Sequence, residues 1–298
     1  SPNGLGYARI PGLFNKAQSD SWKPVTDSVH QRGARIFLQL MHTGRVSHPA
    51  NMPKGSKILA PSPVALTGQI WTDTEGMQNH PVPAEMSQNE IKATIAEFAD
   101  SASLAMDAGF DGVELHSANG YLLEQFLHPK TNLRKDEYGG NAERRQKFVL
   151  DVAEAVSQKI GADRTGIRIS PYGAFNDMGE FEGIKDFYSS LTKRLSNLGL
   201  AYIHIVDHSS MGAPKVNPEI KKMIRKEFQG KVILSGGYTA ESAEADLQEN
   251  KGDLIAFGRP FIANPNLVEK LEQGLPILEA NPATFYTPGK EGFTDYAS

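Results

Sequence analysis

The chain has 298 residues, of which 39% are hydrophobic, so it is long enough to bury a large core in one or two domains. Its formal net charge of −4 gives no basic surface for nucleic acid or for an anionic membrane. The absence of cysteine excludes disulfides, thiolate metal sites, cysteine nucleophiles and thiolate-held iron–sulfur clusters.

Six short apolar runs predict β-strands. They are rich in Ile, Val, Leu and Phe without strict alternation, which is typical of parallel strands covered on both faces. In chain order they are 34–42, 112–117, 165–171, 201–208, 231–237 and 254–260. The first of them is followed by a long, proline-rich stretch, 48–84, for which we expect an irregular excursion.

Amphipathic stretches alternate with these runs and predict helices. Ser87 and Glu90 have the spacing of a capping box ahead of the stretch 91–108. The other predicted helices are 143–160, 184–198, 218–228, 240–249 and 265–273. Strands that alternate with helices imply a parallel sheet, and the regular repeat favours a (β/α)8 TIM barrel. We therefore predict one α/β domain over residues 1–298.

The segment GVELHSANGYLLEQFLH, 112–128, carries the strongest functional signal. If the run 112–115 is a buried strand, His116 lies at its carboxyl end, and the turn that follows brings Asn119 and Tyr121 to the same mouth. Two hydrogen-bond donors and a phenol whose ordinary pKa is about 10 can hold a carbonyl oxygen and protonate a neighbouring carbon. A buried structural histidine beside a loop asparagine is the alternative from these residues alone.

Glycines follow the last two predicted strands, in SGGY and FGRP. Backbone amides without side chains in the way can bind phosphate, and the last two βα loops of a barrel are a common place for such a site. The candidate phosphate-binding residues are Gly237, Gly258 and Arg259, and Gly236 precedes Gly237 in the same loop. No G-x-G-x-x-G fingerprint joins a strand to a helix, so a nicotinamide would bind transiently and not in a Rossmann domain.

The stretch HSANGYLLEQFLHPKTNLRKDEYGGNAERRQKF resembles the signature of the old yellow enzyme family, FMN-dependent ene-reductases. Further similar segments follow in order along the whole chain: QLMHTGRVSHP, GIRISPYGAFND, ILSGGYT, AFGRPFIANP and TFYTPGKEGFTDY. The resemblance implies a cofactor, FMN, that is reduced by NAD(P)H. It also implies that the reduced flavin transfers hydride to the β-carbon of an α,β-unsaturated carbonyl or nitro compound.

The resemblance assigns roles to individual residues of this chain. It implies that His116 and Asn119 hold the substrate oxygen and that Tyr121 protonates the α-carbon. The implied flavin ligands are Gln39, Arg168, Gly236, Gly237, Gly258 and Arg259. The implied substrate-side residues are Met41, Phe175 and Tyr286.

The resemblance also implies that the run 34–42 is the third strand of the barrel and 254–260 the eighth. We therefore expect a chain without the first two strands, with apolar edges that a homo-oligomer or a complementing N-terminal segment would cover.

One alternative is a catalytically defective or complementing fragment of such a barrel. A second alternative is a metal-dependent lyase or hydrolase that uses His116 and His208. We expect no metal, nucleic acid or membrane partner. No run is long and apolar enough for a membrane span, and residues 1–10 lack a signal-peptide pattern, so we expect a cytoplasmic location.

Overall fold

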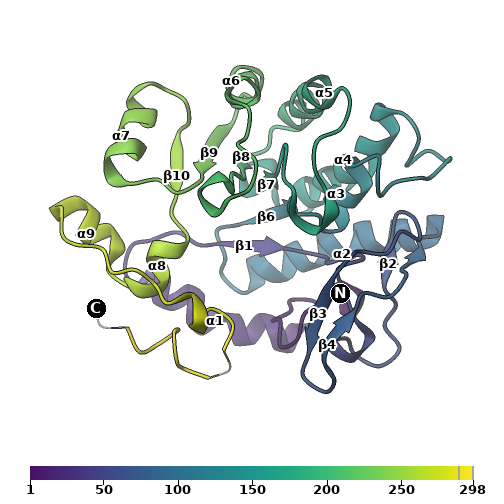
Figure 1. The fold of residues 1–298 in the computed structure, drawn as a ribbon, viewed down its shortest axis with the longest axis horizontal. Coiled ribbons are helices and arrows are strands. Elements are labelled where there is room, and N and C mark those ends of the chain that lie inside the picture. Colours follow the sequence, from purple (N-terminus) through teal and green to yellow (C-terminus); the bar gives the residue numbers. More distant parts are fainter. Residues whose placement is uncertain (288, 297–298) are drawn as a thin grey trace.

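The computed structural model describes residues 1–287 and 289–296. Its centre is a six-stranded parallel sheet in the order β1-β6-β7-β8-β9-β10, which curves across the molecule (Figure 1). The strands are β1 (Phe37–Leu40), β6 (Gly112–Ser117), β7 (Thr165–Ile169), β8 (Tyr202–Ile205), β9 (Lys231–Ser235) and β10 (Leu254–Ala256). All six predicted strands are confirmed, and most are shorter than their apolar runs because the residues at the ends turn into loops.

The helices between the strands cover the outer face of the sheet (Figure 1). They are α2 (Gln88–Asp107), α4 (Ala142–Ile160), α5 (Ile184–Asn197), α6 (Pro218–Glu227) and α7 (Ala240–Gln248), and two short helices, α8 (Arg259–Ala263) and α9 (Leu267–Gln273), follow β10. The predicted capping box is present, because the Ser87 side chain accepts from the Glu90 amide and the Glu90 carboxylate accepts from the Ser87 amide.

Three helices, α1, α3 and the short α8, were not predicted from the sequence, and α8 begins within the predicted strand 254–260. Helix α1 (Lys16–His30) has a polar sequence with Pro24 inside it, and an internal proline ordinarily argues against a helix. It is held by tertiary contacts instead: the Thr26 hydroxyl donates to the Ala108 carbonyl at 2.6 Å. Helix α3 (Leu122–Leu127) is buried on every side, and a helix without a solvent face has no amphipathic pattern to detect.

The stretch 48–84 is more regular than expected. It contains an antiparallel hairpin of β3 (Gln69–Thr72) and β4 (Gly76–Asn79). A second, parallel pair joins β2 (Leu59–Ala60) to β5 (Ala84–Glu85), which begins at the end of the stretch. Our expectation of an irregular excursion was therefore wrong for these two segments. The hairpin begins after Gly68 and turns at Gly76, and both glycines have positive φ. The prolines of the stretch lie outside its strands and do not interrupt them.

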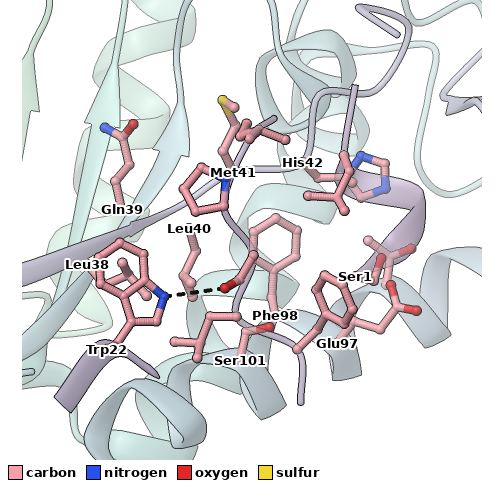
Figure 2. Close-up of a pocket in the computed structure, with 18 residues that line it drawn as sticks. Ser1, Trp22, Leu38, Gln39, Leu40, Met41, His42, Glu97, Phe98 and Ser101 are labelled. Carbon is pink, nitrogen blue, oxygen red and sulfur yellow. Dashed lines mark hydrogen bonds between the residues drawn. The ribbon is translucent and has the colours of Figure 1, made fainter. Parts of the chain in front are cut away.

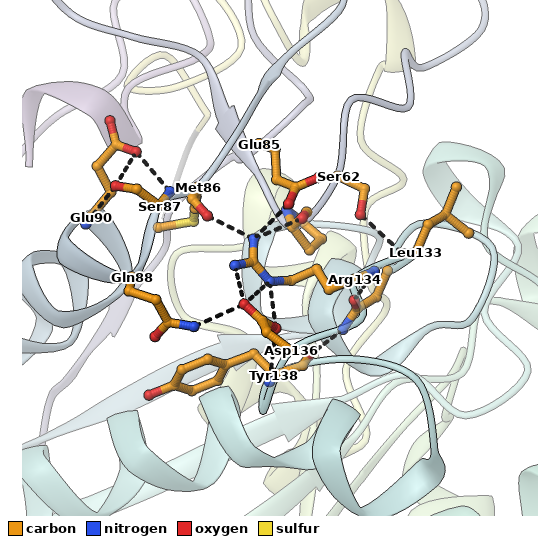
Figure 3. A network of polar contacts seen from close by, with 12 residues as sticks. Ser62, Glu85, Met86, Ser87, Gln88, Glu90, Leu133, Arg134, Asp136 and Tyr138 are labelled. Carbon is orange, nitrogen blue, oxygen red and sulfur yellow. Dashed lines mark hydrogen bonds and ion pairs between the residues drawn. The ribbon is translucent and has the colours of Figure 1, made fainter.

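Arg134 joins this excursion to the loop that precedes α4 (Figure 3). Its guanidinium donates to the carbonyls of Pro61 and Met86, at 3.1 and 2.7 Å, and to the carboxylate of Asp136. The Arg134 side chain is 4% exposed, whereas that of Asp136 is 34% exposed. The interaction thus satisfies the backbone carbonyls that directly follow β2 and β5.

We expect Arg134→Met to lower the free energy of unfolding by about 2 to 4 kcal/mol, because two buried carbonyls and one carboxylate lose their donor. Urea unfolding followed by circular dichroism measures this change. The matched control is Arg35→Met at an arginine with an 82% exposed side chain, which should change stability by less than about 1 kcal/mol. Equal effects of the two substitutions would contradict a structural role for Arg134.

Within the described residues, β1 and β10 each pair with a neighbour on one side only. Apolar side chains at these edges reach solvent, with Phe37 36% and Leu254 53% exposed. The sheet therefore supplies six strands of a (β/α)8 barrel. In the same residues, no helix combines the length and the apolar character that crossing a bilayer requires.

Candidate active site

The carboxyl end of β6 and the turn after it bring together the three residues of the proposed catalytic group. His116 is the penultimate residue of β6, and Asn119 and Gly120 have left-handed φ values of 58° and 74°. Tyr121 is the N-cap residue of α3. This sharp turn folds the chain back, so that the rings of His116 and Tyr121 lie 5.1 Å apart. Asn tolerates the left-handed region better than other non-glycine residues, which suits it to this position.

Asn119 is bound through its backbone and its side chain. Its amide N–H donates to Ser170 Oγ at 2.9 Å, and its carbonyl accepts from Asn176 Nδ2 at 2.7 Å. His208 Nε2 lies 3.0 Å from Asn119 Oδ1 and donates to it. Because Oδ1 is engaged, the NH₂ group of Asn119 remains to donate to a substrate. His208 was not predicted as part of this group, and the structure places it in contact with Asn119.

His116 is a neutral imidazole. Burial, together with the charge of Arg168, lowers the pKa of His116 to about 3. Its Nδ1 is buried and has no hydrogen-bond partner among the described residues. A neutral histidine can donate one hydrogen bond without adding a charge to the site.

The Tyr121 hydroxyl lies 3.0 Å from the hydroxyl of Tyr7, a residue in the N-terminal loop. Burial raises the pKa of both phenols, so both stay protonated at neutral pH. Tyr7 was not among the predicted site residues, since a single tyrosine in a glycine-rich loop has no distinctive pattern. Tyr286, with 90% of its surface exposed, is close enough that its charge would raise both pKa values further.

Gln39 belongs to a network inside the sheet that the sequence did not indicate. Gln39 Nε2 donates to Glu114 Oε1 at 2.7 Å, and His204 Nδ1 lies 3.0 Å from Glu114 Oε2. Burial opposes ionisation of Glu114, but the hydrogen bonds from His204 and Gln39 and the charge of Arg168 outweigh it and lower its pKa. A carboxylate only accepts, so the NH₂ of Gln39 faces Glu114 and its Oε1 remains free to accept from a ligand.

A cavity of about 550 Å³ opens at the carboxyl ends of β8, β9 and β10. Its volume is in the range of small-molecule sites. Its lining includes Arg168, His208, Gly236, Gly237, Gly258 and Arg259. Arg168 Nε is buried without a partner among the described residues, so a polar group of the cavity is left to bind a ligand.

Two glycines let the loop after β9 pass close to the loop after β8. Gly236 and Gly237 have φ values of 131° and 72°. A Cβ at these positions would lie 2.9 Å from Asp207 Cβ and 2.5 Å from Ser210 Cβ. Larger residues therefore fit neither the backbone nor the space. Gly258 differs, because its φ is negative and a Cβ there would meet no atom within 4 Å.

A second cavity, of about 290 Å³, lies between β1, α1 and α2 (Figure 2). It is lined by the rings of Trp22 and Phe98, and the amide of Gln39 points away from these rings. Met41, which we predicted to lie on the substrate side, lines this cavity. Phe175 lies nearer the Asn119 turn, with its ring 4.9 Å from that of His208.

No group of three or more metal-binding side chains occurs in the ranges 1–287 and 289–296. The site instead combines neutral donors, two phenols and a buried guanidinium at the carboxyl ends of parallel strands. In (β/α)8-type enzymes this end of the sheet is the catalytic face. Fold and site together define a barrel-type enzyme with a pocket for a small-molecule cofactor.

Comparisons with known proteins narrow this class. A family model described as NADH:flavin oxidoreductase / NADH oxidase matches residues 1–277. Chanoclavine-I aldehyde reductase of Penicillium roqueforti (strain FM164) is 39% identical over 98% of this chain and 79% of its own length. A probable flavin mononucleotide-dependent alkene reductase of Leishmania infantum is 38% identical over 97% of this chain and 80% of its own.

Comparison with solved structures leads to the same class of enzyme. Morphinone reductase has a TM-score of 0.95 at 37% identity, covering 100% of this chain and 81% of its own. An old yellow enzyme homologue from Zymomonas mobilis has a TM-score of 0.93 at 35% identity, with coverage of 100% and 83%. The chain therefore belongs to the NADH:flavin oxidoreductase / NADH oxidase family, the FMN-dependent oxidoreductases of old yellow enzyme type. The resemblance drawn from the sequence is confirmed.

Proposed function

We propose that this chain reduces the C=C bond of α,β-unsaturated carbonyl or nitro compounds at the expense of NAD(P)H, with FMN as the bound cofactor. The observation that carries the proposal is the juxtaposition of His116, Asn119 and Tyr121 beside the 550 Å³ cavity. His208 connects this group of residues to the cavity, since it lines the cavity and contacts Asn119.

The residues of the cavity fit FMN. The unpartnered Arg168 Nε supports a role in holding the flavin pyrimidine edge, and a fixed guanidinium stabilises negative charge that develops there. Gln39 lines the second cavity, of about 290 Å³, and its Oε1, to which no described residue donates, suits a ring N–H donor. For the phosphate, Gly236, Gly237, Gly258 and Arg259 supply backbone amides and one cation. When bound, FMN supplies the hydride.

The chain's own groups orient the substrate and move one proton. His116 and the NH₂ group of Asn119 donate to the substrate oxygen and stabilise the negative charge that it gains. Tyr121 delivers its proton to the α-carbon, and Tyr7 can then donate to the resulting phenolate oxygen. Met41, Phe175 and Tyr286 are proposed to shape the substrate side.

Flavin binding tests the proposal directly. The purified chain, titrated with FMN, should bind it with quenching of flavin fluorescence and a shifted visible spectrum. Gly237→Ala should weaken FMN binding by about tenfold or more, because the added Cβ meets Ser210.

The matched control is Gly33→Ala, which has a similar φ of 73° but no atom within 4 Å of the added Cβ. Its FMN affinity should equal that of the unsubstituted chain. A folded chain that takes up no FMN would overturn the proposal and favour a catalytically defective or complementing fragment.

A further inference from the structure

Glu124 is a buried carboxyl group that the proposed reaction does not use. It lies on α3, directly behind the Asn119 turn, and is 3% exposed. Its Oε2 accepts from the Gly120 amide at 2.5 Å, and its Oε1 accepts from the Ser170 hydroxyl at 2.6 Å. A carboxyl group in such a position costs desolvation energy, which its hydrogen bonds must offset.

Ser170 extends this interaction to Asn119. While its hydroxyl donates to Glu124, its Oγ accepts from the Asn119 amide at 2.9 Å. Two successive amides of the turn, those of Asn119 and Gly120, are thus bound to one carboxylate, one through Ser170 and one directly. Both residues have left-handed φ values, and side-chain acceptors stabilise such a conformation where no secondary structure does.

The neighbouring side chain, Gln125, binds the carbonyl group of the same residue, Gly120. Gln125 Nε2 donates to the Gly120 carbonyl at 2.7 Å and to the Thr43 carbonyl at 3.1 Å. The N–H and the C=O of Gly120 are therefore both fixed from α3. This arrangement leaves the turn one conformation, in which the side chain of Asn119 meets His208 at the mouth of the cavity.

We propose that Glu124 is a positioning residue which, through Ser170 and Gly120, holds Asn119 in the orientation that binds the substrate oxygen. The inference rests on the proposed function of Asn119. As a carboxylate, Glu124 accepts from both the Gly120 N–H and the Ser170 hydroxyl. A protonated carboxyl could donate to Ser170 Oγ and still accept from Gly120, but a neutral oxygen binds the Gly120 amide less strongly than a carboxylate does.

This difference in hydrogen-bond strength makes the turn sensitive to pH. Burial raises the pKa of Glu124 to about 7, against the hydrogen bonds from Ser170 and Gly120, which lower it. Tyr188 on α5 also faces the carboxylate, but burial raises the pKa of this phenol, so it stays neutral. The carboxylate fraction therefore increases as pH rises through neutrality, and the turn becomes better fixed.

Hydrogen exchange of the Asn119 and Gly120 amides tests the inference without reference to activity. In the unsubstituted protein, the protection factors, corrected for intrinsic exchange, should rise as pH increases through about 7. Glu124→Gln, the neutral isostere, should lower them by about tenfold above that pH and abolish the rise, as expected when a neutral amide oxygen replaces the carboxylate as the acceptor. Ser170→Ala should lower the protection of Asn119 in particular.

Binding of a phenol that is ionised at every pH used provides the second readout. Its affinity for the FMN-loaded protein should fall by about tenfold in Glu124→Gln and Ser170→Ala, and its pH dependence should vanish in Glu124→Gln. Glu154→Gln, at an exposed position of α4, is the control and should change neither measurement.

The two readouts separate the two proposals. Unchanged amide protection in both variants would overturn the role of Glu124, whatever the protein binds. Altered protection with unchanged phenol affinity would show that the turn is fixed as inferred, but that Asn119 does not bind the substrate oxygen.

Discussion

Replacing Tyr121 by Phe is expected to slow reduction of an enone by about 10²-fold, the usual scale for loss of a general acid. The substitution removes only the hydroxyl, so the ring contact with His116 remains. Flavin reduction by NAD(P)H needs no proton from this group and should keep its rate. Stopped-flow spectroscopy resolves the two half-reactions. Tyr138→Phe, at a buried tyrosine that bonds Asp151, is the control and should leave both rates unchanged.

The contact with Tyr7 refines this expectation. Tyr7→Phe leaves Tyr121 in place but removes the hydroxyl 3.0 Å from it, so the phenolate left after proton transfer loses a donor. We expect a smaller loss, of about tenfold, in the same half-reaction. Equal slowing of flavin reduction and enone reduction in Tyr121→Phe would rule out a role confined to proton delivery.

His116→Ala is expected to weaken binding of a phenolate to the FMN-loaded protein by about 10- to 100-fold, since a hydrogen bond to a charged acceptor is worth about 1.5 to 3 kcal/mol. A phenolate resembles the substrate oxygen as it gains charge. The long-wavelength absorbance that phenolates produce over flavin reports the affinity.

His30→Ala, on the outer helix α1, is the control for this measurement. Since burial lowers the pKa of His116 to about 3, the imidazole stays neutral across the neutral pH range. Its own titration should therefore cause no change of affinity there. Unaltered phenolate binding in His116→Ala would remove this residue from the site.

Much of the fold could be predicted from local patterns. The six apolar runs became the six strands, and the capping box at Ser87 starts α2 as expected. Helix α1 was not predicted, because its polar sequence and internal Pro24 argue against a helix, and contacts such as that of Thr26 with Ala108, 82 residues away, are not visible in a local pattern. Propensity and periodicity describe near neighbours and carry no information about such contacts.

The same limit of local patterns explains why only part of the site could be predicted. His116, Asn119 and Tyr121 are close in sequence, and one turn after β6 brings them together. Tyr7 meets Tyr121 across 114 residues and His208 meets Asn119 across 89, so only the folded sheet reveals them. The assignments of Gln39 and Arg168 came from family resemblance, and those of the phosphate glycines came from their place in the last two βα loops. All remain predictions, which the FMN titration addresses.

The bonds that converge on Asn119 also bear on how this enzyme can evolve. Ser170 and Asn176 after β7 and His208 after β8 each bind a different atom of Asn119. A change of length in either loop would therefore shift a residue of the turn as well. Diversification of substrate range would instead act through single side chains outside this set, such as Phe175, which is 43% exposed. Mutational libraries that keep both loop lengths fixed should contain the larger share of active variants.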